Sequence, residues 1–125
     1  MPEPAGPGST FAIHVADLVL DEGVLDPATV LEGSPRVTEA LLWSSADGRV
    51  LRGVWEITEG TVIDVEQDEV FIVVHGRATI EVEGGETSEV GPGDMAVLAR
   101  GARTRWTVHE TLRKVYQITL PDVSG

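Results

Sequence analysis

The chain has 125 residues, of which 42% are hydrophobic, enough for one domain with a single buried core. Its 21 acidic and 9 basic residues give a formal charge of -12, which would repel nucleic acid and anionic membranes. Cysteine is absent, so disulfides, thiolate metal sites and cysteine nucleophiles are excluded.

The first 35 residues lie outside the regular pattern of the chain. Residues 1–10 are rich in Pro and Gly and have neither a basic start nor an apolar run, which predicts a flexible tail and no signal peptide. Residues 11–18 predict an N-terminal strand, and the rest up to residue 35, interrupted by Pro27 and Pro35, predicts a covering loop with at most one helical turn. No run of 18 apolar residues occurs, so we expect no membrane span and a cytoplasmic protein.

Residues 36–120 carry short apolar runs separated by turns, at intervals of about eight to twelve residues. This spacing is typical of an all-β sandwich or barrel, and no helical period competes with it. Asp47 and Gly48 stand between two such runs and predict a hairpin. A further turn is expected at Gly76. Residues 77–83 then alternate between apolar and polar, which predicts a strand with one solvent-exposed face.

The segment between residues 53 and 116 contains a set of motifs in a characteristic order. The order comprises Trp55-Glu56, Gly60, Glu69 and Gly76 in the spacing E-x6-G, the turn GPGD at residues 91–94, Gly101, and Trp106-x-Val108. It resembles the cupin superfamily, and within it the small single-domain cupins related to the ureidoglycine aminohydrolase-type family. The resemblance implies a double-stranded β-helix, a jelly-roll-like barrel of two antiparallel sheets. It also implies a homodimer that pairs through edge strands.

The resemblance implies four ligands to one metal, and this chain keeps one of them. Glu69 stands at the glutamate position of the first motif, whereas Thr104 stands at the histidine position of the second. Depending on the spacing, the two remaining histidine positions hold Ile63 and Val65, or Val62 and Asp64. Because a catalytic transition metal needs several imidazole or carboxylate donors, we expect no tightly bound metal. A divalent ion held by regrouped carboxylates is the alternative.

Two residues are candidate catalytic groups. Glu69 would be a lone carboxylate inside an apolar barrel, which is the arrangement of a general acid or base; the open alternative is a strand-end residue that meets an arginine. His75 follows six residues later, so regular alternation would place both on one face; the alternative is a solvated residue at the barrel rim. Arg113 and Lys114 are assigned to ion pairs on the acidic exterior.

Aromatic and polar residues predict the wall of a pocket inside the barrel. Aromatics make up only 5% of the chain, and several stand at inward-facing or family-signature positions. The candidate ligand-binding residues are Trp55, Phe71, Thr104, Trp106 and Tyr116. For the tryptophans, simple core packing is the alternative.

Three functions from different classes follow. The first is a protein that binds a small organic molecule in its barrel. The second uses the same pocket as a metal-independent isomerase, lyase or cyclase in which Glu69 moves a proton. The third is a divalent-metal-dependent cupin enzyme acting on a ureido-type or related small substrate, as the resemblance implies.

Overall fold

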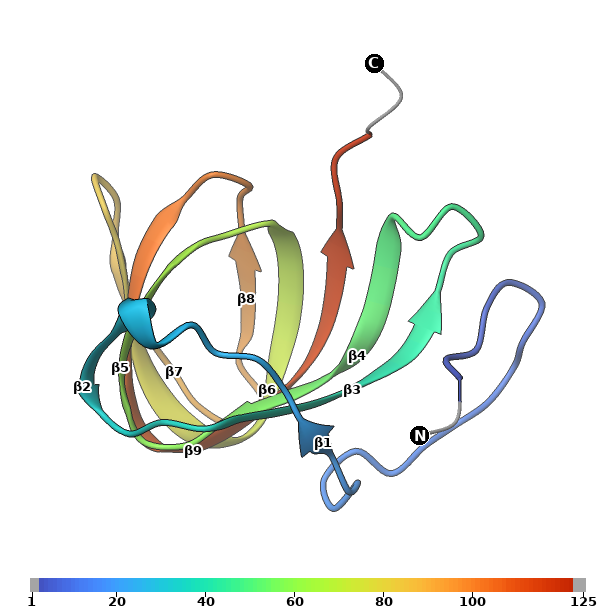
Figure 1. Ribbon diagram of the computed structural model, residues 1–125, viewed down its shortest axis with the longest axis horizontal. Helices are drawn as coiled ribbons and strands as arrows, with labels where there is room; N and C mark the ends of the chain where they lie inside the picture. Colours follow the sequence, from blue (N-terminus) through green and yellow to red (C-terminus); the bar gives the residue numbers. More distant parts are fainter. Residues whose placement is uncertain (1–2, 123–125) are drawn as a thin grey trace.

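The computed structural model describes residues 3–122, and its regular structure consists of strands and one short 3-10 turn (Figure 1). In chain order these are β1 (Asp21–Glu22), η1 (Pro27–Thr29), β2 (Val30–Gly33), β3 (Val37–Ser44), β4 (Val50–Ile57), β5 (Gly60–Val65), β6 (Asp68–Val82), β7 (Thr87–Val90), β8 (Met95–Leu98) and β9 (Arg103–Thr119). The all-β prediction is confirmed. No helix of the described residues is long and apolar enough to cross a bilayer.

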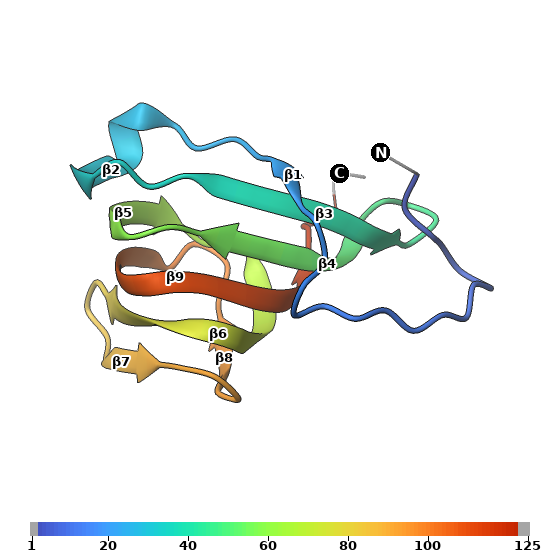
Figure 2. The same ribbon diagram turned by 90° about the horizontal axis from the view of Figure 1, so that it is seen from below.

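The strands form two facing antiparallel sheets that share β6 and β9 (Figure 2). One sheet has the order β1-β3-β4-β9-β6-β8 and uses the second half of β9 and the first half of β6. The other has the order β2-β5-β9-β6-β7 and uses the remaining halves. This is the predicted single-domain cupin barrel, in which two long strands bend from one sheet into the other.

Strand β6 continues through Gly76, where a turn was expected. The register with β9 shifts on both sides of this residue, which makes the site a bulge within a continuous strand. Gly76 has a φ of 90°, and a Cβ there would collide with the backbone of Thr111. The bulge changes which residues face inward, because Phe71 before it and Ala78 after it are both only 1% exposed.

The hairpin predicted at Asp47 and Gly48 joins β3 to β4. Gly48 has a φ of 74°, and the Asp47 carboxylate accepts hydrogen bonds from the Ser45 hydroxyl and the Arg49 amide. The turn chemistry read from the sequence is therefore the chemistry that closes this hairpin.

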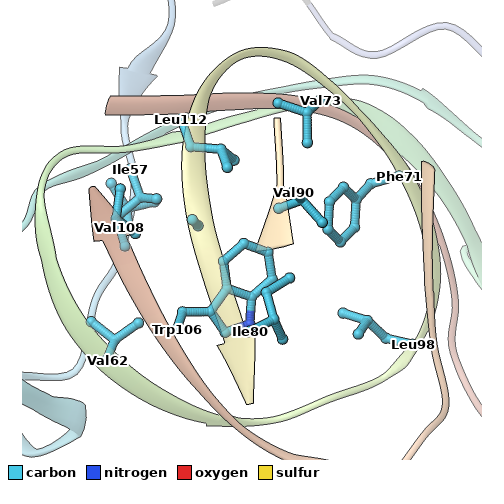
Figure 3. Packing of buried hydrophobic residues seen from close by; sticks show 12 residues of the cluster. Ile57, Val62, Phe71, Val73, Ile80, Val90, Leu98, Trp106, Val108 and Leu112 are labelled. Carbon is cyan, nitrogen blue, oxygen red and sulfur yellow. The ribbon is translucent and has the colours of Figure 1, made fainter. Parts of the chain in front are cut away.

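The core lies between the sheets and is apolar at its centre (Figure 3). Ile57, Phe71 and Leu112 are at most 1% exposed, and Figure 3 shows the Trp106 ring close to Ile80. Phe71 and Trp106 lie with ring centroids 5.5 Å apart. Burial of these side chains supplies the main stabilisation of the barrel, about 2 kcal/mol for each large apolar side chain.

The N-terminal part differs from the strand predicted at residues 11–18. Residues 6–20, here called the strap, are irregular and loop beside β3 (Figure 1). Ala5 pairs with Trp43 at one end of the strap, and β1 pairs with β3 at the other. Between these points the guanidinium of Arg113 donates to three strap carbonyls and so attaches the strap to β9. Most residues of the strap are exposed, so water can solvate the rest of its backbone.

Candidate functional site

A cavity of about 460 Å³ opens between the two sheets. Its wall comes from β3, β4, β5, β6, β9, the turn between β5 and β6, and residues 24–29. The wall includes Leu25, Asp26, Thr29, Glu39, Trp55, Asp64, Glu66, Glu69, Trp106, Lys114 and Tyr116. Residues 24–29 belong to the loop that was expected to cover another part of the chain. The volume of the cavity lies within the range of pockets for small organic ligands.

A larger hollow of about 700 Å³ lies next to this cavity. Its wall includes Val65, Glu81 and Arg103, all exposed. The two hollows share Thr29, Ile63 and Asp64. We place the candidate site in the smaller one because the buried charged groups lie there.

Glu69 is buried in the cavity wall, and it is paired with a lysine. Its Oε2 lies 2.7 Å from Nζ of Lys114, and the two side chains are 5% and 8% exposed. The contact is an ion pair, and no other described residue donates to Oε2. Glu69 is therefore not the lone carboxylate expected from the sequence, and Lys114 does not lie on the exterior.

Three aromatic rings surround the ammonium group of Lys114. Its Nζ lies 4.5 Å from the ring centroid of Trp55, 4.6 Å from that of Phe71 and 5.0 Å from that of Trp106. These distances are those of cation–π contacts, and the group is removed from water. The cavity wall thus holds one internal cation between a carboxylate and an aromatic cage.

Glu66 is a second buried carboxylate and was not among the predicted site residues. It is 5% exposed, and its Oε2 accepts hydrogen bonds from the Thr104 hydroxyl at 2.7 Å and from the Trp106 indole at 3.1 Å. Burial raises the pKa of Glu66, and the nearby Asp64 carboxylate raises it further against the two hydrogen bonds. A carboxyl group with a raised pKa in a cavity is a candidate acid or base.

Tyr116 also lines the cavity. Burial and the charges of Glu39 and Glu69 raise the pKa of its phenol to about 12. A Cβ at Gly53 would overlap the Tyr116 hydroxyl, so the glycine on β4 makes room for this ring. Tyr116 therefore presents a neutral phenol at any pH near 7.

Of the five predicted ligand-binding residues, three line the cavity and two do not. Trp55, Trp106 and Tyr116 line the cavity. Phe71 lies behind the wall at 1% exposure and contacts the cavity through Lys114. Thr104 is also buried, and it donates to Glu66.

His75 and Glu69 do not share a face, which corrects the expected alternation. The bulge beside Gly76 turns His75 outward, where Nε2 lies 3.4 Å from the Glu56 carboxylate and Nδ1 lies 3.3 Å from the Thr111 carbonyl. Its side chain is 43% exposed and is absent from the cavity wall. His75 thus belongs to the outer ion-pair cluster with Glu56 and Arg113.

The donor set does not fit a metal of the cupin type. The residues that the structure describes contain no group of three or more His, Cys, Asp or Glu that could hold an ion. Strand β5 turns Val62 and Asp64 toward the cavity, and Glu69 already has an ammonium at 2.7 Å. That ammonium would repel a divalent cation from the one family-type ligand that remains.

Glu66 could have been found by two signals in the sequence. It continues the inward series Val62, Asp64 at a spacing of two, and the buried indole of Trp106 requires an acceptor. The outward assignment of Lys114 was wrong, and its own strand carried the signal. Lys114 lies two residues before Tyr116, which was predicted to line the pocket, so strand alternation puts the two on one face and Arg113 on the other.

Residues 44–116 match the sequence model of a family described as the EutQ-like cupin domain. No protein with a curated function matches the chain.

Solved structures match the fold. A protein of unknown function of the DUF861 family from Pseudomonas syringae pv. tomato superposes with a TM-score of 0.75 and 24% identity, over 83% of this chain and 46% of that one. The EutQ protein of Clostridium difficile gives a TM-score of 0.61 and 22% identity, over 71% and 66% of the two chains. An ethanolamine utilization protein Q from Salmonella typhimurium gives 0.58 and 17%, over 83% and 99%. The chain thus spans about half the length of the Pseudomonas protein.

Proposed function

Because the chain belongs to the EutQ-like cupin family and its barrel encloses a cavity with aromatic walls, we propose that it binds a small organic molecule between the two sheets. The observation that carries this proposal is the cavity of about 460 Å³ in which buried Glu66, Glu69 and Lys114 meet Trp55 and Trp106. Buried charges are costly unless they serve a fold or a ligand. An apolar wall with a few converging polar groups is typical of a ligand site.

A fragment screen by nuclear magnetic resonance tests this proposal. The chain has three tryptophans, so its indole N–H signals are few and can be assigned with single Trp→Phe variants. We expect fragments of fewer than about 15 heavy atoms to shift the Trp106 signal, since this indole contacts the cavity. Val62→Phe, which fills the cavity, is the control and should abolish the shifts while its circular dichroism stays unchanged.

The outcome that contradicts the proposal is also defined. If no fragment shifts Trp106 in the wild type, or if Val62→Phe binds the same fragments equally well, the cavity is not a binding site.

A second candidate is a metal-independent isomerase, lyase or cyclase in the same cavity. The raised pKa of Glu66 favours it, because a carboxyl group that holds its proton closer to neutral pH can both give and accept one. Glu69, the acid/base expected from the sequence, would act in this reading through its contact with Lys114. Bound fragments that carry a carbonyl group should exchange the adjacent C–H for deuterium in heavy water, and Glu66→Gln should slow that exchange at least about a hundredfold.

The metal-dependent enzyme on a ureido-type substrate is the remaining proposal, and the poor donor set weighs against it. Elemental analysis of protein purified without chelator decides this point. One equivalent of a transition metal per chain would favour the metal-dependent enzyme over the other two functions.

A further inference from the structure

The charged groups of the cavity are strongly unbalanced. Five carboxylates line it, those of Asp26, Glu39, Asp64, Glu66 and Glu69, against the single ammonium of Lys114. Glu69 and Lys114 neutralise each other at 2.7 Å. Of the other four carboxyl groups, Glu66 is buried, and Asp26, Glu39 and Asp64 are exposed, so they lie where water reaches the cavity. An anionic ligand entering this space would meet repulsion from each of them.

One buried carboxylate keeps an oxygen that a ligand could reach. Glu66 is 5% exposed, and both of its hydrogen bonds go to Oε2, so Oε1 receives none from the described residues. Unlike Glu69 Oε2, which lies 2.7 Å from the Lys114 ammonium, Glu66 Oε1 is not sealed off from solvent. In the cavity wall this oxygen can accept an N–H or O–H group of a ligand.

The aromatic wall already accommodates an ammonium group. The Lys114 ammonium lies within 5.0 Å of three ring centroids in this cavity, although the lysine belongs to the protein itself. Trp55 and Trp106 lie with centroids 6.1 Å apart at 65°, so the two rings present faces in different directions. The same wall offers apolar area to the carbon chain of a ligand.

We propose that the ligand is an organic cation with at least one N–H bond, a primary or secondary amine, whose ammonium binds beside Glu66 and Asp64 while its carbon chain lies against Trp106. This proposal rests on the proposed function and specifies its ligand class. A bound cation would also relieve the repulsion between Asp64 and Glu66, which is one of the causes that raise the pKa of Glu66.

Three probes with the same four-carbon chain and different charge test this inference: n-butylammonium, n-butanol and butyrate. Each is titrated against the wild-type protein while the Trp106 indole signal is followed. We expect n-butylammonium to bind at least about tenfold more tightly than either of the others, because it alone combines charge attraction with N–H donors.

Matched variants assign the effect to the cavity. Glu66→Gln keeps an acceptor for Thr104 and Trp106 but loses the charge, and it should weaken n-butylammonium at least about tenfold. Glu89→Gln removes one exposed carboxylate on β7, outside the cavity, and should change the affinity less than about twofold. If Glu66→Gln does not fold, Asp64→Asn, at an exposed position, replaces it.

The outcomes separate this inference from the proposed function. Equal or tighter binding of butanol or butyrate at Trp106 overturns the cation proposal and leaves the ligand cavity intact. Absence of any shift with all three probes overturns it as well, and the fragment screen then decides whether the cavity binds anything.

Discussion

Two neighbouring residues of β9, Arg113 and Lys114, each pair with a glutamate, on opposite sides of the same sheet. On the outer side Arg113 reaches Glu56 at 2.9 Å and donates to the carbonyls of Val15, Ala16 and Leu18. On the inner side Lys114 lies 2.7 Å from Glu69 and is otherwise surrounded by aromatic rings. The outer pair also binds backbone carbonyls and so fastens the strap, whereas the inner pair lies in the wall of the cavity.

The largest effect is expected on the inner side. Lys114→Met should lower the free energy of unfolding by about 4 kcal/mol, because it leaves the Glu69 carboxylate buried without its cation. Urea unfolding measures this, and the double variant Glu69→Leu with Lys114→Met should recover most of the loss. A loss below about 1 kcal/mol in the single variant would mean that the inner pair carries no buried charge.

On the outer side, Arg113→Met should cost about 2 kcal/mol. The loss is smaller because the Glu56 side chain is 21% exposed and water can solvate its charge. The strap should also become sensitive to proteases between residues 6 and 20. Arg77→Met removes an exposed pair with Glu110 and is the control, with less than about 0.5 kcal/mol expected; equal stability of the two variants would refute the role of Arg113 as a fastener.

Glu66→Gln tests whether the buried charge of the Glu66 carboxylate destabilises the folded protein. Since the folded pKa of Glu66 is raised, its contribution to stability is complete below the unfolded pKa of about 4.5 and is lost as the pH rises through the folded value. The variant should therefore be more stable than the wild type by about 1 kcal/mol at pH 8, and the difference should shrink toward pH 4. Thermal melts across this range measure it, and a difference independent of pH would contradict it.

Tyr116 reports the negative field of the cavity directly. It is the only tyrosine of the chain, so the ultraviolet absorbance of tyrosinate follows its ionisation alone. The midpoint of this pH titration should lie near 12. The sign is that of a raised folded pKa, so the stability linked to the neutral phenol is present below about pH 10 and is lost between about 10 and 12. Glu39→Gln should lower the midpoint, and a midpoint near 10 in the wild type would argue against a buried phenol.

The smallest effect is expected for His75. It lies on the outer side with Glu56 and is 43% exposed, so His75→Gln should change the free energy of unfolding by less than about 0.5 kcal/mol. The indole N–H signal of Trp106 should keep its wild-type chemical shift in this variant. A loss of cavity binding in this variant would return His75 to the catalytic role predicted from the sequence.

The fold was predictable because its determinants are local. Gly-rich turns, short alternating runs and the hairpin at Asp47 are set by neighbouring residues, and their spacing predicts an all-β sandwich or barrel. The resemblance to the cupins then specified which barrel. The site was less predictable because it depends on strand parity across distant pairings. The shift of β6 at Gly76 moved His75 outward, and the pairing of β9 placed Lys114 inside, so the partners of Glu69 could not be read from its own strand.

The bulge at Gly76 has a consequence for how this barrel tolerates change. Before it the odd-numbered residues Glu69, Phe71 and Val73 are buried, and after it the even-numbered residues Ala78 and Ile80 are buried. The apolar residues of both halves belong to one core cluster. Loss of a single residue at this point would therefore exchange the inward and outward side chains of one half of the strand, so the length of β6 is constrained more strictly than the identity of its outward residues.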